Sequence, residues 1–303
     1  MRSPTPEFIL MGVSYMATVG RGKYRYEVNE NWAKLPQGMT LGEVSAAAVD
    51  SQDRVYVFQR KDPPVVVFDR DGNYVNSWGH GSTNFAHGIY IGSDDLIYLT
   101  DRDDHVCLKY TVDGKPLQIL GTRGKFSDTG CEEDSGKVLR PGGPFNKPSG
   151  MVNSPSGDLY VSDGYRNCRV HRFSADGHLI QSWGEPGKTA PSEFHAPHDL
   201  WVDKQGVVYV CDRDNERVQV FSANGEYKAM WTDMGRATSI WMDADETVYV
   251  TELTPALGVW DKQGNLLQRV ESVPSHWITG DSHGDLYLAG AGVPSVTKYT
   301  KQS

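Results

Sequence analysis

Short stretches in which apolar and polar residues alternate recur along the chain. Six of them share one shape: a turn, then alternating apolar residues with a tyrosine at a fixed place, then a polar tip. They are DRVYVFQR at 53, DLIYLTDR at 95, DLYVSDGY at 158, GVVYVCDR at 206, ETVYVTEL at 246 and GDLYLAG at 284. Period-two alternation with many β-branched residues predicts strands. Helix signals are nearly absent, so the pattern predicts an all-β chain.

The spacing of the repeated tyrosines predicts the architecture. The tyrosines are Tyr56, Tyr98, Tyr160, Tyr209, Tyr249 and Tyr287. A second strand follows each of the first five tyrosine-containing strands, and a hairpin turn follows that strand. The turn contains a glycine at a nearly constant distance from the tyrosine, as Gly72 and Gly114 show in the first two units. Units of about 40 to 50 residues with four short strands are typical of propeller blades. The sequence therefore predicts a six-bladed β-propeller with four-stranded blades.

Two irregularities in the repeat predict a loop and a closing strand. Blades two and three are separated by an extra polar, Gly-rich stretch at residues 121–145, and we expect this long loop to lie over the channel mouth as a lid. The residues after Tyr287 do not provide an outermost strand for the sixth blade. YRYEV at 24–28 can supply that strand and so close the ring. Residues 1–20 are predicted to be a disordered leader, and residues 21–303 a single propeller domain.

Composition and charge exclude several partners. The net charge of −9 argues against nucleic acid and anionic membranes, both of which attract clustered Lys and Arg. The chain has no run of 18 apolar residues, so no membrane span is predicted. The four cysteines form no CxxC pair and no paired framework. We interpret them as free thiols of a reducing compartment, which predicts a cytoplasmic location.

Histidines recur in register in alternate blades. The residues eleven positions before the six tyrosines are Ser45, His87, Ser149, His198, Thr238 and His276. Alternate blades of a six-bladed ring are related by about 120°, so three equivalent side chains converge on one point of the channel. Three imidazoles around one point form a tetrahedral metal site with an open fourth position. Zinc is the expected ion, and copper, iron and nickel also suit such ligands.

Other candidate residues lie at the strand tips. Arg60, Arg102 and Arg213 follow their tyrosines by four residues, and Tyr165 lies one step further in blade three. Guanidinium groups there could bind a carboxylate beside the metal. We favour that role for Arg60 and interpret Arg102 as part of a structural ion pair with the preceding aspartate. His195 is either a substrate contact or a loop residue. The remaining histidines, His80, His105, His171, His178 and His283, are interpreted as surface or core residues.

Several segments resemble the lyase domain of peptidylglycine α-amidating enzymes, within the NHL-repeat propellers. They are LGEVSAAAVD (41–50), FQRKD (58–62), AHGI (86–89), YVSDGYRNCRVHRFSADG (160–177), WGEPG (183–187), APHDL (196–200) and DRDNERVQVF (212–221), with SHWITGDSHGDLY (275–287) matching more weakly. The resemblance implies that His87, His198 and His276 bind zinc. It also implies that Tyr165 is the catalytic base and that Arg60 and Arg213 are active-site arginines.

Departures from the family pattern concern calcium, disulfides and the substrate pocket. The family has an aspartate directly after its third histidine, which helps to bind a structural calcium ion, and here Trp277 stands there. A methionine two residues before that histidine is Pro274 here. Lys147, Arg166 and Tyr209 stand where the family has disulfide cysteines. We therefore expect calcium to be weakly bound or absent, held at most by backbone carbonyls such as those of Ala47 and Ile89.

The resulting expectation is a metal-dependent lyase for a small carbinolamide-like substrate that bears a carboxylate. The family splits N-substituted α-hydroxyglycines into an amide and glyoxylate. Two alternatives remain open. One is a hydrolase or hydratase that activates water on the same metal, and the other is a non-enzymatic NHL propeller that binds peptides or proteins. The register of the histidines favours an enzyme, because a binding module needs no metal-ligand geometry.

Overall fold

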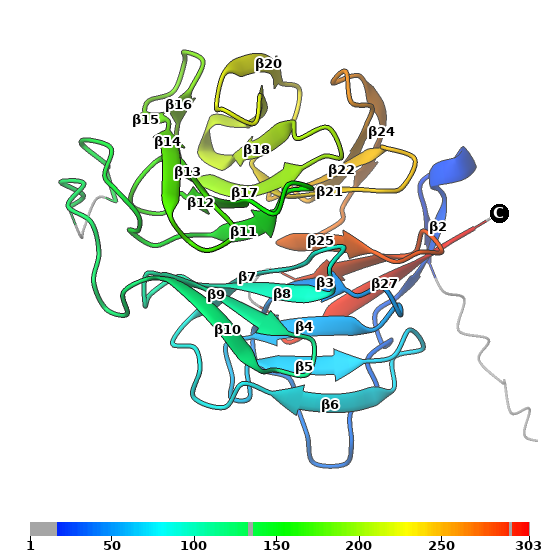
Figure 1. Cartoon of the computed structure of the whole chain (residues 1–303). Coiled ribbons are helices and arrows are strands. Elements are labelled where there is room, and N and C mark those ends of the chain that lie inside the picture. The colour runs from blue at the N-terminus through cyan, green and yellow to red at the C-terminus, as the bar shows by residue number, and fades with distance from the viewer. Residues whose placement is uncertain (1–16, 133–135, 291–292, 303) are drawn as a thin grey trace, which may run out of the picture.

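A computed structural model describes residues 17–132, 136–290 and 293–302, in which six antiparallel sheets are arranged as the blades of a ring (Figure 1). Blade one comprises β3 (Val44–Val49), β4 (Val55–Gln59), β5 (Val65–Phe68) and β6 (Tyr74–Trp78). Blade two comprises β7 (Ala86–Ile91), β8 (Leu96–Asp101), β9 (Val106–Thr111) and β10 (Pro116–Gly121). Blade three comprises β11 (Gly150–Asn153), β12 (Leu159–Asp163), β13 (Arg169–Phe173) and β14 (Leu179–Trp183).

The second half of the ring repeats this plan. Blade four comprises β17 (Pro197–Val202), β18 (Val208–Asp212), β19 (Arg217–Phe221) and β20 (Tyr227–Trp231). Blade five comprises β21 (Ala237–Met242), β22 (Val248–Glu252), β23 (Ala256–Trp260) and β24 (Leu266–Glu271). Blade six comprises β25 (Trp277–Gly280), β26 (Leu286–Ala289) and β27 (Val296–Lys301), extended by β2 (Tyr26–Asn29) and β1 (Thr18–Val19). The short elements β15 (Glu185–Pro186), β16 (Glu193–Phe194), η1 (Gly22–Tyr24) and η2 (Arg213–Asn215) lie outside this repeat.

The ring is closed between the two ends of the chain, as predicted. The innermost strands of neighbouring blades contact one another around the channel, including β25 against β3. β2 pairs antiparallel with β27, with Tyr26 opposite Lys301, and so covers the edge that blade six would otherwise expose. β1 falls within the predicted leader and pairs with β2, so the sheet begins before residue 21. The rest of that leader, residues 1–16, lies outside the described residues.

The repeated tyrosines anchor the second strand of each blade. All six are buried, and five donate a hydrogen bond from the hydroxyl to an aspartate in the turn that precedes the strand. In blade one, Tyr56 Oη donates to Asp50 Oδ2 at 3.0 Å. In blade three, where Ser154 stands at the position of Asp50 and the turn's Asp158 pairs with Arg172, Tyr160 donates to the carbonyl of Ala223 in the next blade. The repeat therefore carries a large apolar ring together with a buried hydroxyl that has a partner.

The hairpin glycines are needed where one blade packs on the next. Gly225 has a φ of +73°, and a Cβ there would lie 2.7 Å from Cδ2 of Trp183, at the end of the preceding blade. Gly114 has the same relation to Trp78. These glycines adopt the positive φ that the turn requires, and their lack of a side chain leaves room for the indole ring between blades.

The cysteines have the free state that the sequence analysis predicts. All four cysteines are free, and Cys107, Cys168 and Cys211 are buried. None of the helices in the described residues has the length and apolar character that crossing a bilayer requires. The cytoplasmic location stays a prediction.

Candidate metal centre

β-Bulges near the start of the innermost strands direct side chains into the channel. The pairing of β7 with β8 shifts between Ala86 and Ile89, and that of β17 with β18 shifts between Pro197 and Asp199. His87 and His198 lie within these shifts. A bulge leaves a residue without a partner and changes the direction of its side chain, so strict alternation does not apply here. His276 directly precedes β25, and its backbone N–H donates a hydrogen bond to the carbonyl of Ala289. Its ring lies together with those of His87 and His198.

The three histidines meet in the channel as predicted. Their ring centroids are 4.9 Å apart for His87 and His198, 5.1 Å for His87 and His276, and 4.8 Å for His198 and His276. One ligand atom from each lies within 4.8 Å of the others. The triangle is nearly equilateral, which is the arrangement expected when alternate blades each supply one residue.

Each imidazole is held in one orientation by the backbone of the intervening blade. Nδ1 of His87 lies 2.6 Å from the carbonyl of Ser149, and Nδ1 of His276 lies 2.7 Å from that of Ser45. Nδ1 of His198 makes the equivalent bond to Thr238, at 2.6 Å. Because Nδ1–H is donated to a carbonyl, Nε2 keeps its lone pair and faces the channel. The small hydroxyl residues found in alternate blades therefore contribute backbone carbonyls, a role that residue type alone does not reveal.

The charge state of the histidines suits metal binding. Burial lowers the pKa of His87 and His198 well below the usual value, and the pKa of His276 to about 4, with nearby positive charges adding to the effect. At neutral pH all three rings are uncharged and have a free nitrogen lone pair. Three neutral, oriented imidazoles around one point fit a transition-metal ion such as zinc.

Tyr165 lies against two of the three histidines. It belongs to the turn at 164–167 after β12, and its hydroxyl oxygen is 2.9 Å from Nε2 of His87 and 3.0 Å from Nε2 of His198. Nη1 of Arg213 lies 3.4 Å from the same oxygen. The structure therefore brings Tyr165 and Arg213 together with Nε2 of His87 and His198, the candidate metal ligands.

Arg60 lies on the same rim but does not contact Tyr165. Its Nη1 pairs with the Glu43 carboxylate, and its guanidinium carbon lies 4.0 Å from the Phe85 ring centroid. Burial lowers the pKa of Arg60, and the charge of Glu43 opposes that effect. For Arg213, burial is the largest single effect and acts to lower the pKa, but the hydrogen bonds and electrostatic attraction of Asp214 and Tyr165 together outweigh it, and the pKa is raised. Both groups stay charged near the histidines.

Arg102 belongs to this rim as well, which corrects the predicted pairing with Asp101. Asp101 accepts hydrogen bonds from the backbone N–H groups of Asn84 and Phe85 instead. Arg102 pairs with Asp103 at 2.9 Å, and its guanidinium carbon lies 3.8 Å from the Phe85 ring centroid and 5.1 Å from that of Tyr165. The site therefore has three arginines, two of which flank the tyrosine.

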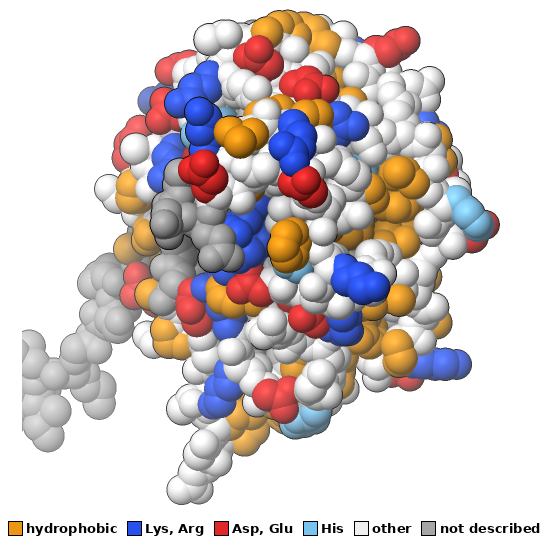
Figure 2. Space-filling view, turned by 90° about the vertical axis from the view of Figure 1, so that its left-hand side faces the viewer, with side chains coloured by type: hydrophobic (Ala, Val, Ile, Leu, Met, Phe, Trp, Pro, Cys, Tyr) orange, Lys and Arg blue, Asp and Glu red, His pale blue; other side chains and the backbone are white. Residues whose placement is uncertain are grey.

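The insertion at 121–145 contributes to the wall of a pocket beside the histidines. A cavity of about 510 Å³ is lined by Val138 of the insertion together with Tyr165, Phe194, His195 and Arg213. The loop is fixed to blade three, for example by the bond from the Gly142 N–H to Oδ1 of Asn167. It lies on the side that carries Tyr165 and Arg213, at the left in Figure 1, and Figure 2 shows side chains of both charges mixed on that side. Residues 133–135 of this loop lie outside the described residues.

On the other side of the histidines, Trp277 occupies the channel. Its ring centroid lies 6.2 Å from those of His87 and His276 and 6.5 Å from that of His198. Gly88 makes room for it, since a Cβ there would lie 2.9 Å from Cη2 of the indole. An indole offers no oxygen to calcium. Trp277 therefore supplies no calcium ligand here, and weak or absent calcium at this position stays a prediction.

Comparisons with known proteins agree with these features. The family model of the NHL repeat matches residues 145–173 and 194–221, which lie in blades three and four and the segments before them. Human NHL repeat-containing protein 3 is 29% identical over 96% of this chain and 88% of its own length. A probable peptidyl-α-hydroxyglycine α-amidating lyase of Caenorhabditis elegans is 29% identical over 60% of this chain and 56% of its own length. The resemblance found in the sequence is thereby confirmed.

A solved structure supports the fold. A gluconolactonase from Xanthomonas campestris has a TM-score of 0.65 over 95% of this chain and 95% of its own, with 14% identity. At that identity the likeness shows a shared propeller fold alone.

Proposed function

We propose that this NHL-repeat propeller, a relative of the peptidyl-α-hydroxyglycine α-amidating lyases, is a metal-dependent lyase. Its substrate is an N-substituted α-hydroxyglycine or a similar carbinolamide with a carboxylate. The reaction breaks the bond between the hydroxyl-bearing carbon and the amide nitrogen. The hydroxyl oxygen becomes the aldehyde oxygen of glyoxylate, and its proton ends on the nitrogen of the released amide.

The observation that carries this proposal is the convergence of five side chains. The three histidine Nε2 atoms face one point, the Tyr165 hydroxyl lies within 3.0 Å of two of them, and Arg213 lies 3.4 Å from that hydroxyl. A metal ion on His87, His198 and His276 would polarise the substrate hydroxyl as a Lewis acid. A base and cations within reach of that hydroxyl are what the bond cleavage needs in addition.

Tyr165 is the group that moves the proton. To accept a proton from the substrate hydroxyl its oxygen must carry negative charge, and Arg102 and Arg213 stabilise that charge. Their guanidinium carbons lie 5.1 and 5.2 Å from the phenol ring centroid. After the carbon–nitrogen bond breaks, the same oxygen can return the proton to the amide nitrogen.

The arginines also orient the substrate. A guanidinium group has five N–H donors, so one carboxylate partner, such as Glu43 on Arg60 or Asp214 on Arg213, leaves donors for a second. Bidentate bonds to the substrate carboxylate would fix the direction of the carbon that reacts. The cavity of about 510 Å³ next to Tyr165 and Arg213 then holds the N-substituent against Val138 and Phe194.

Substitution of Tyr165 by phenylalanine tests this assignment. Tyr165→Phe removes one oxygen, so metal content and melting temperature should stay unchanged, while kcat for glyoxylate release should fall about 100-fold or more. The measurement is steady-state glyoxylate release from a set of N-acyl-α-hydroxyglycines. Tyr227→Phe, at an exposed tyrosine of β20, is the matched control and should keep full activity.

The outcome separates the lyase from its two rivals. If Tyr165→Phe retains full activity, the lyase assignment fails and a hydrolase or hydratase becomes the better account, since metal-bound water ionises near neutral pH without such a base. If the zinc-loaded wild-type chain acts on no α-hydroxyglycine and on no hydrolysable substrate, a binding function is favoured.

A further inference from the structure

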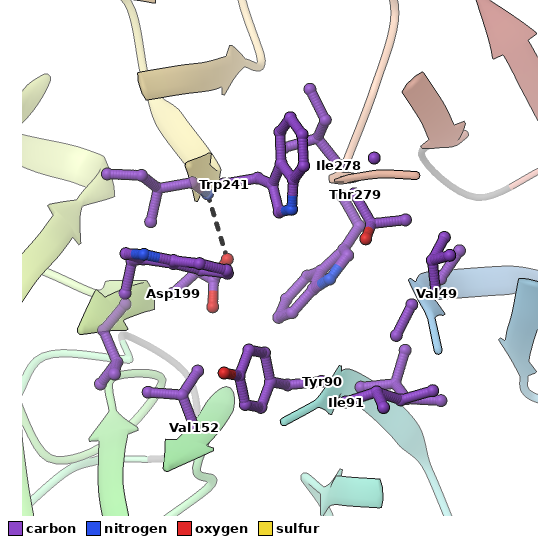
Figure 3. A pocket seen from close by; sticks show the side chains of 16 residues that line it. Val49, Tyr90, Ile91, Val152, Asp199, Trp241, Ile278 and Thr279 are labelled. Atoms are coloured by element: carbon purple, nitrogen blue, oxygen red, sulfur yellow. Dashed lines mark hydrogen bonds between the residues drawn. The ribbon is translucent and has the colours of Figure 1, made fainter. Parts of the chain in front are cut away.

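The channel contains a second cavity that the proposed reaction does not use. It has a volume of about 60 Å³ and is lined by Tyr90, Asp199, Trp201, Trp241, Trp277 and Thr279, together with aliphatic residues. None of the three histidines lines it. Figure 3 shows the carboxylate of Asp199 and the rings of Tyr90 and Trp241 on the cavity wall. We call this space the aromatic chamber.

Asp199 is one of two buried acids in the described residues that form no ion pair with a lysine or arginine; the other, Asp163, lies beside the ring of His171. The remaining buried acids pair with lysine or arginine, namely Asp50, Asp101, Asp203, Asp212, Asp281, Asp285 and Glu252. Asp199 is 3% exposed and accepts hydrogen bonds from Oγ of Ser239 at 2.7 Å and from the N–H of Ile240 at 3.1 Å. A buried carboxylate that lacks a cation is costly, so a positive ligand beside it would be stabilised.

The aromatic rings are placed to receive such a ligand. Tyr90, Trp201 and Trp241 all stand three residues after the histidine register, in blades two, four and five. The rings of Tyr90 and Trp201 are perpendicular, at 85° with centroids 5.6 Å apart, so they enclose a corner of the chamber. Gly280 lets Trp241 approach the axis, since a Cβ there would lie 2.4 Å from its Cη2. Ring faces attract cations through their quadrupole.

We propose that the aromatic chamber binds the methylated ammonium group of a small organic cation. A water-sized site occupies about 10 to 15 Å³ on the same volume scale, so 60 Å³ accommodates about four or five heavy atoms. A trimethylammonium group has that size. A calcium or magnesium ion would need six or more oxygen ligands, whereas Asp199 is the only carboxylate on the wall. A primary ammonium would need three acceptors, and the lining is mostly apolar.

An adjoining pocket gives the rest of the ligand a place. A cavity of about 420 Å³ shares Tyr90 and Trp201 with the chamber, and its charged lining residues are Asp203, Lys204, Asp243 and Glu246. Tyr90, Trp201 and Trp241 are partly exposed, so the chamber can be reached from this side. Asp203 and Glu246 pair with Lys262, so Asp243, for which the described residues offer no ion pair, is the carboxylate that favours a cation here. The proposal does not depend on lyase activity, because the chamber and the metal centre share no side chain.

Choline is a direct probe, and 3,3-dimethylbutan-1-ol is its neutral isostere. We expect choline to bind the full chain at least tenfold more tightly than the isostere in calorimetric titrations at constant ionic strength. We also expect it to change the tryptophan fluorescence. Equal affinity for the two compounds, or no choline binding at tens of millimolar, would overturn the proposal. So would a calcium affinity that exceeds the choline affinity.

Two variants locate the binding to the chamber. Asp199→Asn keeps the shape and removes the charge, so choline affinity should fall at least tenfold, whereas Asp176→Asn, at an exposed aspartate, should leave it unchanged. Trp201→Leu, at a partly exposed ring, should also lower the choline affinity. This variant provides the test if Asp199→Asn does not fold. Unchanged choline affinity in either folded chamber variant contradicts the proposal.

Discussion

Each histidine of the metal centre directs one nitrogen into the channel because its other nitrogen is bonded to a carbonyl. The carbonyls of Ser45, Ser149 and Thr238 lie 2.6 to 2.7 Å from the three Nδ1 atoms. These bonds fix the tautomer before any metal arrives. The orientation therefore comes from the fold, and a change at one of the hydroxyl residues that preserved the backbone would leave it intact.

Arg102 should matter for catalysis at this scale. Arg102→Ala removes a cation from beside Tyr165 and should lower kcat/KM about 10- to 100-fold for substrates with a carboxylate, with little change in melting temperature. Arg25→Ala, at an exposed arginine before β2, is the control and should keep normal kinetics. If Arg102 has only a structural role, Arg102→Ala will lower the melting temperature and leave kcat/KM unchanged.

The sequence predicted the histidines but misassigned Arg102, for a physical reason. Register against the tyrosines is a property of the repeat, so it found His87, His198 and His276. An Asp-Arg-Asp sequence offers the arginine two partners, and the turn after β8 decides between them. There the backbone N–H groups of Asn84 and Phe85 engage Asp101, which leaves Asp103 for Arg102.

Among the elements, the insertion connects the cavity beside Tyr165 to the propeller. Val138 packs against a core cluster that includes Cys168 and Phe194 and also lines the cavity beside Tyr165, while the neighbouring Leu139 is 53% exposed. Hydrogen bonds attach the loop to blade three, as between Gly142 and Asn167. The segment therefore acts as a wall of the pocket rather than as a free lid.

A pair of adjacent substitutions tests this role of the insertion. Val138→Asp places a charge in the pocket and should raise KM at least fivefold for substrates with apolar N-substituents. Leu139→Asp places the same charge in solvent and should leave KM within about twofold. Steady-state kinetics with both variants decides the matter. Equal KM values would show that the insertion does not contact the substrate.

The repeated elements could be predicted from sequence, and the short ones could not. The blades follow from tyrosines and turn glycines that recur at nearly constant spacing, and the closing strand follows from the apolar stretch at 24–28. β1 and the parallel pair β15 and β16 are two residues long. Two residues carry no periodicity, and their pairing depends on tertiary contacts.

For the whole molecule, the central channel is divided by Trp277 into two halves of different character. The half with the histidines carries three arginines and the proposed chemistry, while the other half carries aromatic rings and Asp199. The closed ring holds the three histidine-bearing blades at fixed mutual angles. Stability of the ring and geometry of the metal centre are therefore coupled.

The burial of neutral histidines in the channel predicts how the free energy of unfolding of the metal-free chain depends on pH. The pKa of His276 is about 4 in the folded chain, below its unfolded value near 6.5, so protons bind the unfolded chain first. Stability is complete above pH 6.5 and should fall as the pH drops toward 4, by about 1.4 kcal/mol per pH unit for this histidine. Urea unfolding with chelator between pH 7.5 and 5 measures this slope. His276→Asn should show a shallower slope, and equal slopes in the two chains would contradict the burial of a neutral ring.

The most direct test of the central claim is the metal content of the purified full chain by mass spectrometry after zinc loading and desalting. The account predicts about one ion per chain in the wild type and in His178→Ala, an exposed histidine, and almost none in His87→Ala. It is contradicted if the wild type retains no ion, or if His87→Ala retains as much as the wild type.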